Sequence, residues 1–274
     1  MSALDDLFDR LWTDYTAITP QAARIHELLV TRGERIVNDH VALRTFDLPG
    51  LEIEALDRAF VAAGYQPAQS YEFRDKKLHA YHYEHRDPDR PKLFISALHV
   101  NELSGEAGTL IEQLAAQMER GADAHPMFAS SGRHWQLDRA TYERLAAESE
   151  YAAWVAAFGL RANHFTVSVN HLATFSGLAE LNDFLRDQGF QLNEAGGAIK
   201  GSPGELLEQS STLADEVDVA MEDGPHRVPS CYVEFARRYP GPDGTLFQGF
   251  VPASADRIFE STDRRRLVRG APQG

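Results

Sequence analysis

The chain has 274 residues, of which 43% are hydrophobic and 25% charged, and its 27 basic and 41 acidic residues give a formal net charge of −14. This length and composition predict a globular protein with a sizeable core, and we expect a single domain over residues 1–274. The acidic balance excludes a general nucleic-acid binder, which needs basic surface stripes. An anionic ligand would therefore depend on a local cationic side chain.

The sequence favours an intracellular location without membrane association. Cys231 is the only cysteine, so no disulfide forms within the chain, as in a reducing cytoplasm, and we expect it to pack as a small apolar group. The N-terminal residues MSALDDLFDRLW lack the features of a secretory signal peptide. No apolar run approaches the length that spans a bilayer. We therefore expect a cytoplasmic protein with neither a membrane nor a nucleic-acid partner, while the oligomeric state stays open.

The first half of the chain predicts a βαβββ unit preceded by helices. Apolar residues recur at helical spacing near the N-terminus, and Pro20, which suits a first helical turn, divides that stretch. Gly64 is a candidate helix end. The expected elements are two helices within 3–32, a strand over 38–46, a helix over 52–63 and β-like runs within 65–100. We take 33–100 as the first repeat.

Residues 101–160 predict a mostly helical insert, after which the first pattern starts again. His164 follows His40 by 124 residues, and Gly189 follows Gly64 by 125. We take residues 161–252 as the second repeat. Its expected elements are a strand over 161–170, a helix ending at Gly189, and strands within 230–240 and 245–252. A short helix at ADRIFEST and a frayed tail at DRRRLVRGAPQG complete the chain.

Two βαβββ-type repeats predict an α+β fold in which a curved mixed sheet surrounds a central cup and helices cover its outer faces. Side chains alternate along a strand, so His40 and Arg44 share one face. His164 occupies the matching place in the second repeat. A single strand histidine is more often structural than a ligand, but two at equivalent positions favour metal binding, because imidazole is a common ligand of first-row metals.

Glu234 is the candidate for a third, anionic ligand. In CYVEFARRY it shares a strand face with Tyr232 and Ala236, and a carboxylate in an apolar strand is costly unless it is paired or metal-bound. The alternatives are an ion pair with Arg237 or Arg238, or exposure on an edge strand. Two histidines and one carboxylate leave open positions for substrate and O₂, which is typical of non-haem Fe(II) oxygenases.

The segment LHAYHYEH offers a rival metal site through His79, His82 and His85. In a strand His79 and His85 share one face and His82 lies on the other. Ligation by all three therefore needs a distorted strand. Solvated or hydrogen-bonded histidines are the favoured interpretation of this segment.

Arg44 has two interpretations. It lies roughly 13 Å from His40 along an extended strand, at about 3.3 Å per residue, and its long side chain reaches back toward His40. It would then pair with the far carboxylate of a substrate whose other end chelates the metal. The alternative is a salt bridge to Asp39, Asp47 or Glu234.

Five segments together resemble the 2-oxoadipate dioxygenase/decarboxylase family, also called hydroxyglutarate synthase, over roughly residues 20–263. They are NDHVALRTF, ANHFTVSVN, LLEQSSTLADEVDVAMEDG, CYVEFARRY and LFQGFVPASADRIFEST. This family is related in fold to the vicinal-oxygen-chelate enzymes, in agreement with the expected repeats. The resemblance implies that His40, His164 and Glu234 hold Fe(II) and that Arg44 binds the substrate's distal carboxylate.

The resemblance also implies substrate contacts at Ala253 and Ser254, and motif character places Gln209, Ser210 and Ser211 in the pocket. The implied reaction converts 2-oxoadipate, or a similar 2-oxo diacid, with O₂ to 2-hydroxyglutarate and CO₂. A metal-dependent isomerase or lyase and a non-catalytic ligand-binding module are the alternatives for the same cup. Other divalent metals also suit a site of two histidines and a glutamate.

Overall fold

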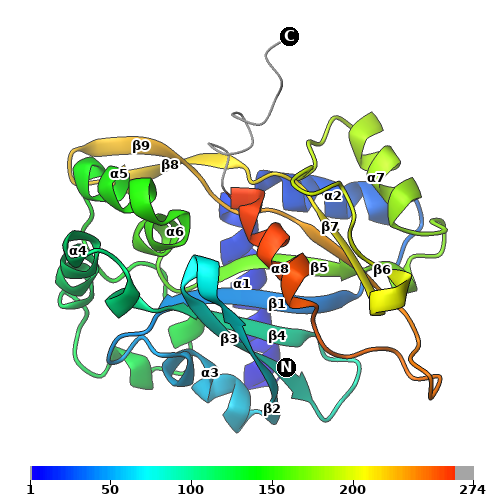
Figure 1. Ribbon diagram of the computed structural model, residues 1–274, viewed down its shortest axis with the longest axis horizontal. Helices are drawn as coiled ribbons and strands as arrows, with labels where there is room; N and C mark the ends of the chain where they lie inside the picture. The colour runs from blue at the N-terminus through cyan, green and yellow to red at the C-terminus, as the bar shows by residue number, and fades with distance from the viewer. Residues whose placement is uncertain (1, 263–274) are drawn as a thin grey trace.

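The computed structural model describes residues 2–262, and a curved eight-stranded sheet lies at its centre (Figure 1). The sheet has the order β2-β3-β4-β1-β5-β10-β7-β6, and β8 and β9 form a separate hairpin. Residues 263–274, predicted to form a frayed tail, lie outside the described residues. The strands are β1 (Asn38–Phe46), β2 (Tyr65–Phe73), β3 (Leu78–His85), β4 (Lys92–Leu98), β5 (Ala162–Ser168), β6 (Lys200–Ser202), β7 (Leu207–Ser211), β8 (Glu216–Met221), β9 (Gly224–Pro229) and β10 (Glu234–Arg238).

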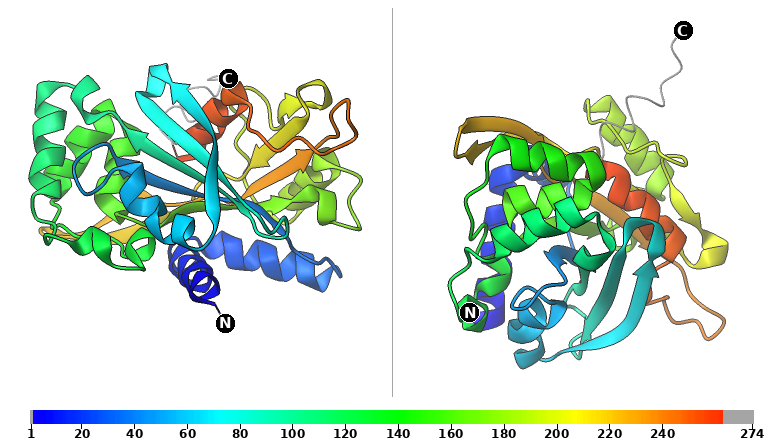
Figure 2. Two further views of the ribbon diagram at one scale, coloured as in Figure 1. Left: turned by 90° about the horizontal axis from the view of Figure 1, so that it is seen from below. Right: turned by 60° about the vertical axis from the view of Figure 1, so that its left-hand side comes forward.

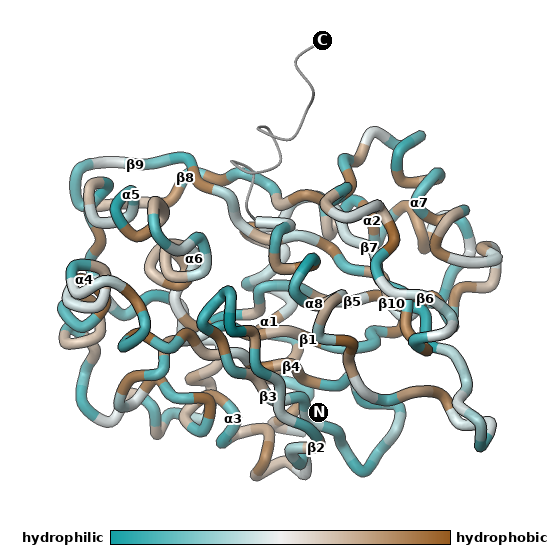
Figure 3. Tube along the Cα trace, viewed as in Figure 1, coloured by the Kyte–Doolittle hydropathy of each residue, from teal (hydrophilic) through white to brown (hydrophobic). Residues whose placement is uncertain are grey.

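Helices cover both faces and one end of the sheet. In Figure 2, α1 and α2 lie against one face while α8 crosses the opposite one. The tube in Figure 3 alternates between hydrophobic and hydrophilic stretches along the surrounding helices, as amphipathic surface helices require. No helix within residues 2–262 is both long and apolar enough to span a membrane. The helices are α1 (Ala3–Ile18), α2 (Pro20–Thr31), α3 (Ile53–Ala62), α4 (Gly105–Ala115), α5 (Arg139–Glu148), α6 (Glu150–Phe158), α7 (Leu178–Asp187) and α8 (Pro252–Phe259).

The sheet consists of two matching halves. In the first, β1 is followed by α3, β2, β3 and β4, and β4 returns to pair with β1 in parallel. In the second, β5 is followed by α7, β6, β7 and β10, and β10 pairs with β5 in parallel. Because β1 and β5 pair antiparallel, the halves join at the middle of the sheet. This confirms the predicted fold class, while the predicted limits of the repeats and of the insert (33–100, 161–252 and 101–160) stay predictions.

The apolar side of the sheet centre is covered by α1. Its N-terminus has a capping box formed by Ser2 and Asp5, and Pro20 begins α2 as predicted. The indole of Trp12 meets the ring of Phe165 on β5 edge-on, with centroids 5.1 Å apart. The buried residues of α1 are Leu4, Leu7, Leu11 and Tyr15.

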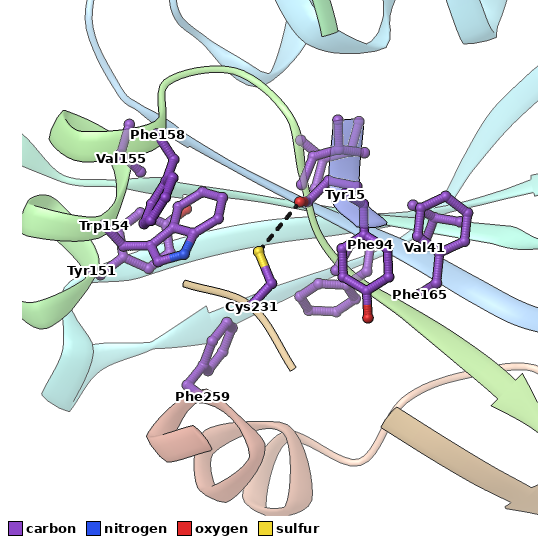
Figure 4. Packing of buried hydrophobic residues seen from close by; sticks show 14 of the residues in the cluster. Tyr15, Val41, Phe94, Tyr151, Trp154, Val155, Phe158, Phe165, Cys231 and Phe259 are labelled. Carbon is purple, nitrogen blue, oxygen red and sulfur yellow. Dashed lines mark hydrogen bonds between the residues drawn. The ribbon is translucent and has the colours of Figure 1, made fainter. Parts of the chain in front are cut away.

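Cys231 lies in the same apolar interior (Figure 4). Its thiol donates a weak hydrogen bond to the carbonyl oxygen of Ala162, with the two atoms 3.8 Å apart. Burial raises the pKa of this thiol to about 12, so it stays protonated and unreactive at neutral pH. The expectation that it packs as an apolar group agrees with this environment.

The helical insert places α6 against β1. Every residue from Tyr151 to Phe158 is buried, so this helix is part of the core rather than a surface layer. Trp154 anchors it by donating from Nε1 to the carbonyl oxygen of Ser230, 2.6 Å away. As a result, the first residues of α6 lie beside the strand that carries His40 and Arg44.

The prediction of a strand over residues 245–252 is wrong. Leu246 forms only an isolated bridge with Pro240, and the chain then runs beside the sheet without joining it. Two of its carbonyl groups, on Phe247 and Gly249, accept hydrogen bonds from Nη1 of Arg238 at 3.0 and 2.7 Å. A buried guanidinium, instead of a strand ladder, therefore satisfies this backbone. The segment leads into α8, which contacts β2, β6 and β7 and so bridges the two halves.

Candidate metal centre and substrate pocket

Three adjacent strands bring His40, His164 and Glu234 together. The residues come from β1, β5 and β10 respectively, and their ligand atoms all lie within 4.8 Å of one another. One carboxylate oxygen of Glu234 is 3.1 Å from Nε2 of His164, and the other is 3.6 Å from Nε2 of His40. The side chains are buried, with exposed fractions of 2%, 5% and 1%. The repeat predicted the histidine pair, the family resemblance implied the full set, and the structure places the three residues in one cluster.

Neighbouring side chains orient both imidazole rings. Nδ1 of His40 contacts a carboxylate oxygen of Asp39 at 2.8 Å, and Nδ1 of His164 contacts the amide oxygen of Asn163 at 3.0 Å. In each ring Nδ1 is therefore the donor and the lone pair is on Nε2, and Nε2 of His40 also accepts a hydrogen bond from the hydroxyl of Thr166, 3.0 Å away. Both Nε2 atoms face Glu234, which is the arrangement that metal-ligating histidines require.

Asp39 is itself held in place by Arg238. The guanidinium donates to both carboxylate oxygens, with distances of 2.7 and 2.9 Å. Burial alone would raise the pKa of Asp39, but the charge of Arg238 and the hydrogen bond from His40 hold that pKa well below its usual range. Arg238 was predicted as a possible partner of Glu234, and it pairs with Asp39 instead. The same guanidinium also binds the backbone of residues 247–249. Arg238 therefore links the orientation of the His40 imidazole to the segment that lies over this ring.

The charges of the cluster suit a divalent cation. Burial lowers the pKa of His164, which keeps its imidazole neutral. Burial would raise the pKa of Glu234, but His40, His164 and the amide of Gln209 outweigh it, and that pKa is lowered. Gln209 Nε2 donates to Oε1 of Glu234 at 2.6 Å. Two imidazole nitrogens and one carboxylate form a donor set for iron and for other first-row divalent metals.

Aromatic rings wall the cluster. Phe250 meets the ring of His40 edge-on at 4.8 Å, and Tyr232 stacks on His164 at 4.8 Å. The hydroxyl of Tyr232 is buried and has no hydrogen-bond partner within residues 2–262. The cavity measures about 20 Å³, which is close to the room that one water molecule needs. Its lining residues are His40, Phe94, His164, Gln209, Tyr232, Glu234, Phe250, Ala255, Ile258 and Phe259.

Arg44 lies behind this cavity, buried to 1% exposure. Its Nη1 is 3.1 Å from Oε1 of Glu150, the first residue of α6, and both of its terminal nitrogens lie 3.4 Å from the hydroxyl of Thr262. The guanidinium carbon lies 5.6 Å from the ring of Phe259, which also lines the cavity. Burial opposes the charge, but the carboxylate of Glu150 outweighs it and raises the pKa of Arg44. Sequence reasoning missed this partner.

The other expected pocket residues lie in different environments. Ala253 is exposed, and Ser254 is buried where α8 approaches Gly201 of β6. Neither lines the cavity, whereas three later residues of α8 do, so substrate contact by Ala253 and Ser254 stays a prediction. Gln209 lines the cavity. Ser210 instead bonds Asn182 of α7, and the hydroxyl of Ser211 is 2.8 Å from that of Ser261.

The three histidines of LHAYHYEH do not gather around one point. Nδ1 of His82 is 2.7 Å from the hydroxyl of Tyr71, and its Nε2 is 3.2 Å from Glu84. His85 contacts the backbone oxygen of Ala63 at 3.1 Å. These contacts agree with the favoured interpretation of hydrogen-bonded histidines, since His82 and His85 have separate partners.

Two βαβββ repeats joined in one curved sheet define a vicinal-oxygen-chelate-like fold class. Within this class, the family model for 2-oxoadipate dioxygenase/decarboxylase matches residues 4–244. The chain belongs to this family.

Relatives in plants support this assignment. A chloroplastic/amyloplastic 2-oxoadipate dioxygenase/decarboxylase of Oryza sativa is 34% identical over 93% of this chain and 77% of its own length. The crystal structure of hydroxyglutarate synthase from Oryza sativa in complex with 2-oxoadipate superposes with a TM-score of 0.89 at 33% identity, covering 96% of this chain and 93% of that one. The crystal structure of a protein from Shewanella frigidimarina that is described as a putative hydrolase is 51% identical, with a TM-score of 0.86 and coverage of 91% of this chain and 98% of that one.

Proposed function

We propose that this protein is an Fe(II)-dependent dioxygenase/decarboxylase that converts 2-oxoadipate, or a similar 2-oxo diacid, with O₂ to 2-hydroxyglutarate and CO₂. For 2-oxoadipate the atoms balance without a further co-substrate. The observation that carries the proposal is the placement of a His₂Glu cluster and a buried arginine on either side of one apolar wall. The relative from Oryza sativa, crystallised with 2-oxoadipate, supports the choice of substrate.

His40, His164 and Glu234 would hold the metal. The chemistry that a bound iron(II) would supply is Lewis-acid binding of the 2-oxo acid group and activation of O₂. Asp39 and Asn163 keep Nε2 of the two imidazoles unprotonated and directed at the site, and a metal would replace the hydroxyl of Thr166 as the partner of Nε2 of His40. Gln209 keeps the Glu234 carboxylate in one orientation. The protein thus supplies a preorganised donor set, so little side-chain order has to be gained on binding.

Arg44 would recognise the far end of the substrate. Its guanidinium stays charged at any physiological pH and presents a fork that matches a carboxylate. Because it is held by the rings of Tyr151 and Trp154, at 4.9 and 5.3 Å, its position is constrained. A fixed cation at a set distance from the cluster selects the chain length of the diacid and places one carbon next to the reacting centre.

Phe94, Phe250 and Phe259 would exclude water from the reacting atoms. The same rings leave too little room, at about 20 Å³, for a six-carbon acid. Admission of substrate therefore requires displacement of α8 or of the 247–251 segment. The carboxylate of Glu150 pairs with Nη1 of Arg44, so an incoming diacid also has to take its place.

The test is O₂ consumption by protein loaded with Fe(II) under anaerobic conditions and then mixed with 2-oxoadipate and air-saturated buffer. We expect one CO₂ and one 2-hydroxyglutarate for each O₂ consumed. 2-Oxohexanoate, which lacks the distal carboxylate, is the matched control and should react far more slowly. Failure to turn over any 2-oxo diacid would refute the proposal, and product formation without O₂ would favour an isomerase or lyase.

We also propose a cytoplasmic location. The support is chemical: the single cysteine is buried, protonated and free of any disulfide, as in proteins of reducing compartments. Fractionation of cells that express the full chain, followed by immunoblotting, would test this location.

A further inference from the structure

A second group of possible metal ligands lies at the other end of the first repeat. Asp47 directly follows β1, His99 directly follows β4, and His79 is the second residue of β3. Their ligand atoms all lie within 4.8 Å of one another. None of the three residues lines the cavity around the His₂Glu cluster, so this group, which we name the strand-end cluster, is a separate feature.

The backbone of the strand-end cluster is fixed by the sheet. Asp47 N donates to the carbonyl oxygen of Leu98, and His99 N donates to that of Lys77, both at 2.9 Å. His79 belongs to β3, which is paired on both sides, with β2 and β4. Ligands that project from paired strands keep their spacing without a bound ion, which is the preorganisation that a metal site needs.

The side chains of the cluster have unused bonding capacity. The rings of His79 and His99 stack, with centroids 4.6 Å apart and an angle of 23°. Nδ1 of His99 is 3.2 Å from Oδ2 of Asp47. Nδ1 of His79 is buried yet has no hydrogen-bond partner in the described part of the chain. A buried polar atom without a partner is costly, and a cation would satisfy such a lone pair.

We propose that Asp47, His79 and His99 bind a divalent transition-metal ion and that Zn²⁺ is the best match. Zinc takes imidazole nitrogen and carboxylate oxygen in small, nearly tetrahedral sites, whereas Mg²⁺ and Ca²⁺ prefer sites made of oxygen alone. Glu72 on β2 has a carboxylate oxygen 3.7 Å from Nε2 of His99, whereas Asp47 faces Nδ1, so Glu72 would orient this imidazole from its other nitrogen, and water would be the fourth ligand. The net charge of −14 favours cation binding overall.

The bound ion would join the ends of β1, β3 and β4. These strands carry or flank His40 and Arg44, so a cross-link there would stiffen the half of the sheet that presents the first imidazole. The ligands lie far apart in the unfolded chain, so zinc would bind only the folded state at this site. The midpoint temperature of thermal unfolding would therefore rise as the zinc concentration increases.

The experiment counts zinc ions per chain by equilibrium dialysis of the metal-free full-length protein. His99→Ala and His79→Ala should each bind one ion fewer than the wild type, with affinity at that site reduced more than about 100-fold, since even outer partners of metal ligands contribute 10- to 100-fold. His125→Ala is the matched control, because His125 is exposed and lies outside the cluster. It should bind as many ions as the wild type.

Cobalt(II) provides an independent readout. The wild type should show the visible absorption of a tetrahedral ion at the strand-end cluster, and Asp47→Asn should reduce it while leaving the signal of the His₂Glu cluster. Equal zinc stoichiometry in the wild type and in both histidine variants would overturn the proposal. Should an alanine variant fail to fold, His99→Gln gives the same comparison. The difference in stoichiometry does not depend on turnover, so the result stands whatever the substrate proves to be.

Discussion

Replacement of Glu150 by glutamine tests how a diacid reaches Arg44. In the structure the Glu150 carboxylate is 3.1 Å from Nη1 of Arg44, so a substrate carboxylate has to displace it. Glu150→Gln keeps the size of the side chain and removes its charge. We expect the variant to bind dicarboxylates more tightly, because the internal competitor is weaker while Arg44 keeps its charge.

The magnitude follows from the geometry of the pair. Two unit charges about 4 Å apart attract by about 4 kcal/mol at an effective dielectric constant near 20. The Glu150 side chain is 27% exposed, so part of this attraction is screened, and the displaced carboxylate regains hydration. We therefore expect a net gain of about 1–2 kcal/mol, which corresponds to roughly a 5- to 30-fold lower Kd.

Calorimetric titration with adipate provides the assay, because adipate has both carboxylates and no keto group to be turned over. Glu148→Gln is the matched control: Glu148 belongs to the same insert but accepts hydrogen bonds from Ser104 and does not contact Arg44. The KM for 2-oxoadipate should fall in Glu150→Gln, whereas the KM for 2-oxohexanoate should not. An unchanged or weaker adipate affinity would show that Glu150 only supports the fold. It would refute the idea that a substrate carboxylate displaces Glu150 from Arg44.

Three further changes test the surroundings of the site. Gln209→Leu removes the hydrogen bond that orients Glu234, so iron affinity should fall about 10- to 100-fold in a chelator competition; unchanged affinity would mean that the amide has no positioning role. Tyr232→Phe removes a buried hydroxyl that has no partner within residues 2–262, so urea denaturation should show a free energy of unfolding about 1 kcal/mol higher, and a loss would contradict this. Burial lowers the pKa of Lys200 to about 8. Between about pH 8 and 10.5 the unfolded chain therefore binds more protons at Lys200 than the folded chain does. The free energy of unfolding should rise by roughly 3 kcal/mol as the pH increases across that window. Lys200→Met should lack this rise, and parallel pH profiles for the two proteins would contradict the assignment.

Strand periodicity and the internal repeat were enough to pair His40 with His164 and to make Glu234 a candidate third ligand, while the full set was implied by the family resemblance. Side chains alternate along a strand, so the position of His40 between apolar residues determined its face. The repeat then identified His164 as its equivalent, and the cost of burying Glu234 pointed to a third member. These are local properties of short segments, and the three strands meet in the structure as the pattern predicted. The division of the first helices at Pro20 was predictable for the same reason.

The contacts around the cluster depend on tertiary packing. Arg44 pairs with Glu150, 106 residues later in the chain, because the buried helix α6 packs its first turn against β1. Arg238 lies four residues beyond Glu234, but it reaches across the sheet to Asp39 and to the 247–249 backbone. No periodicity indicates such partners, since their positions depend on the packing of whole elements. The strand predicted at 245–252 failed for this reason: a guanidinium took the place of a neighbouring strand.

The sequence by itself thus determined most of the elements, the repeat, the family resemblance and the strand face on which each candidate ligand lies. Tertiary structure alone decided that α8 bridges the two halves, that the cavity of the cup measures about 20 Å³, and that Glu150 forms an ion pair with Arg44. The physical reason is the separation along the chain over which each interaction acts. Alternation and helical spacing are set by neighbours along the backbone, whereas a pocket wall or an ion pair forms only when surfaces distant in the chain are buried against each other.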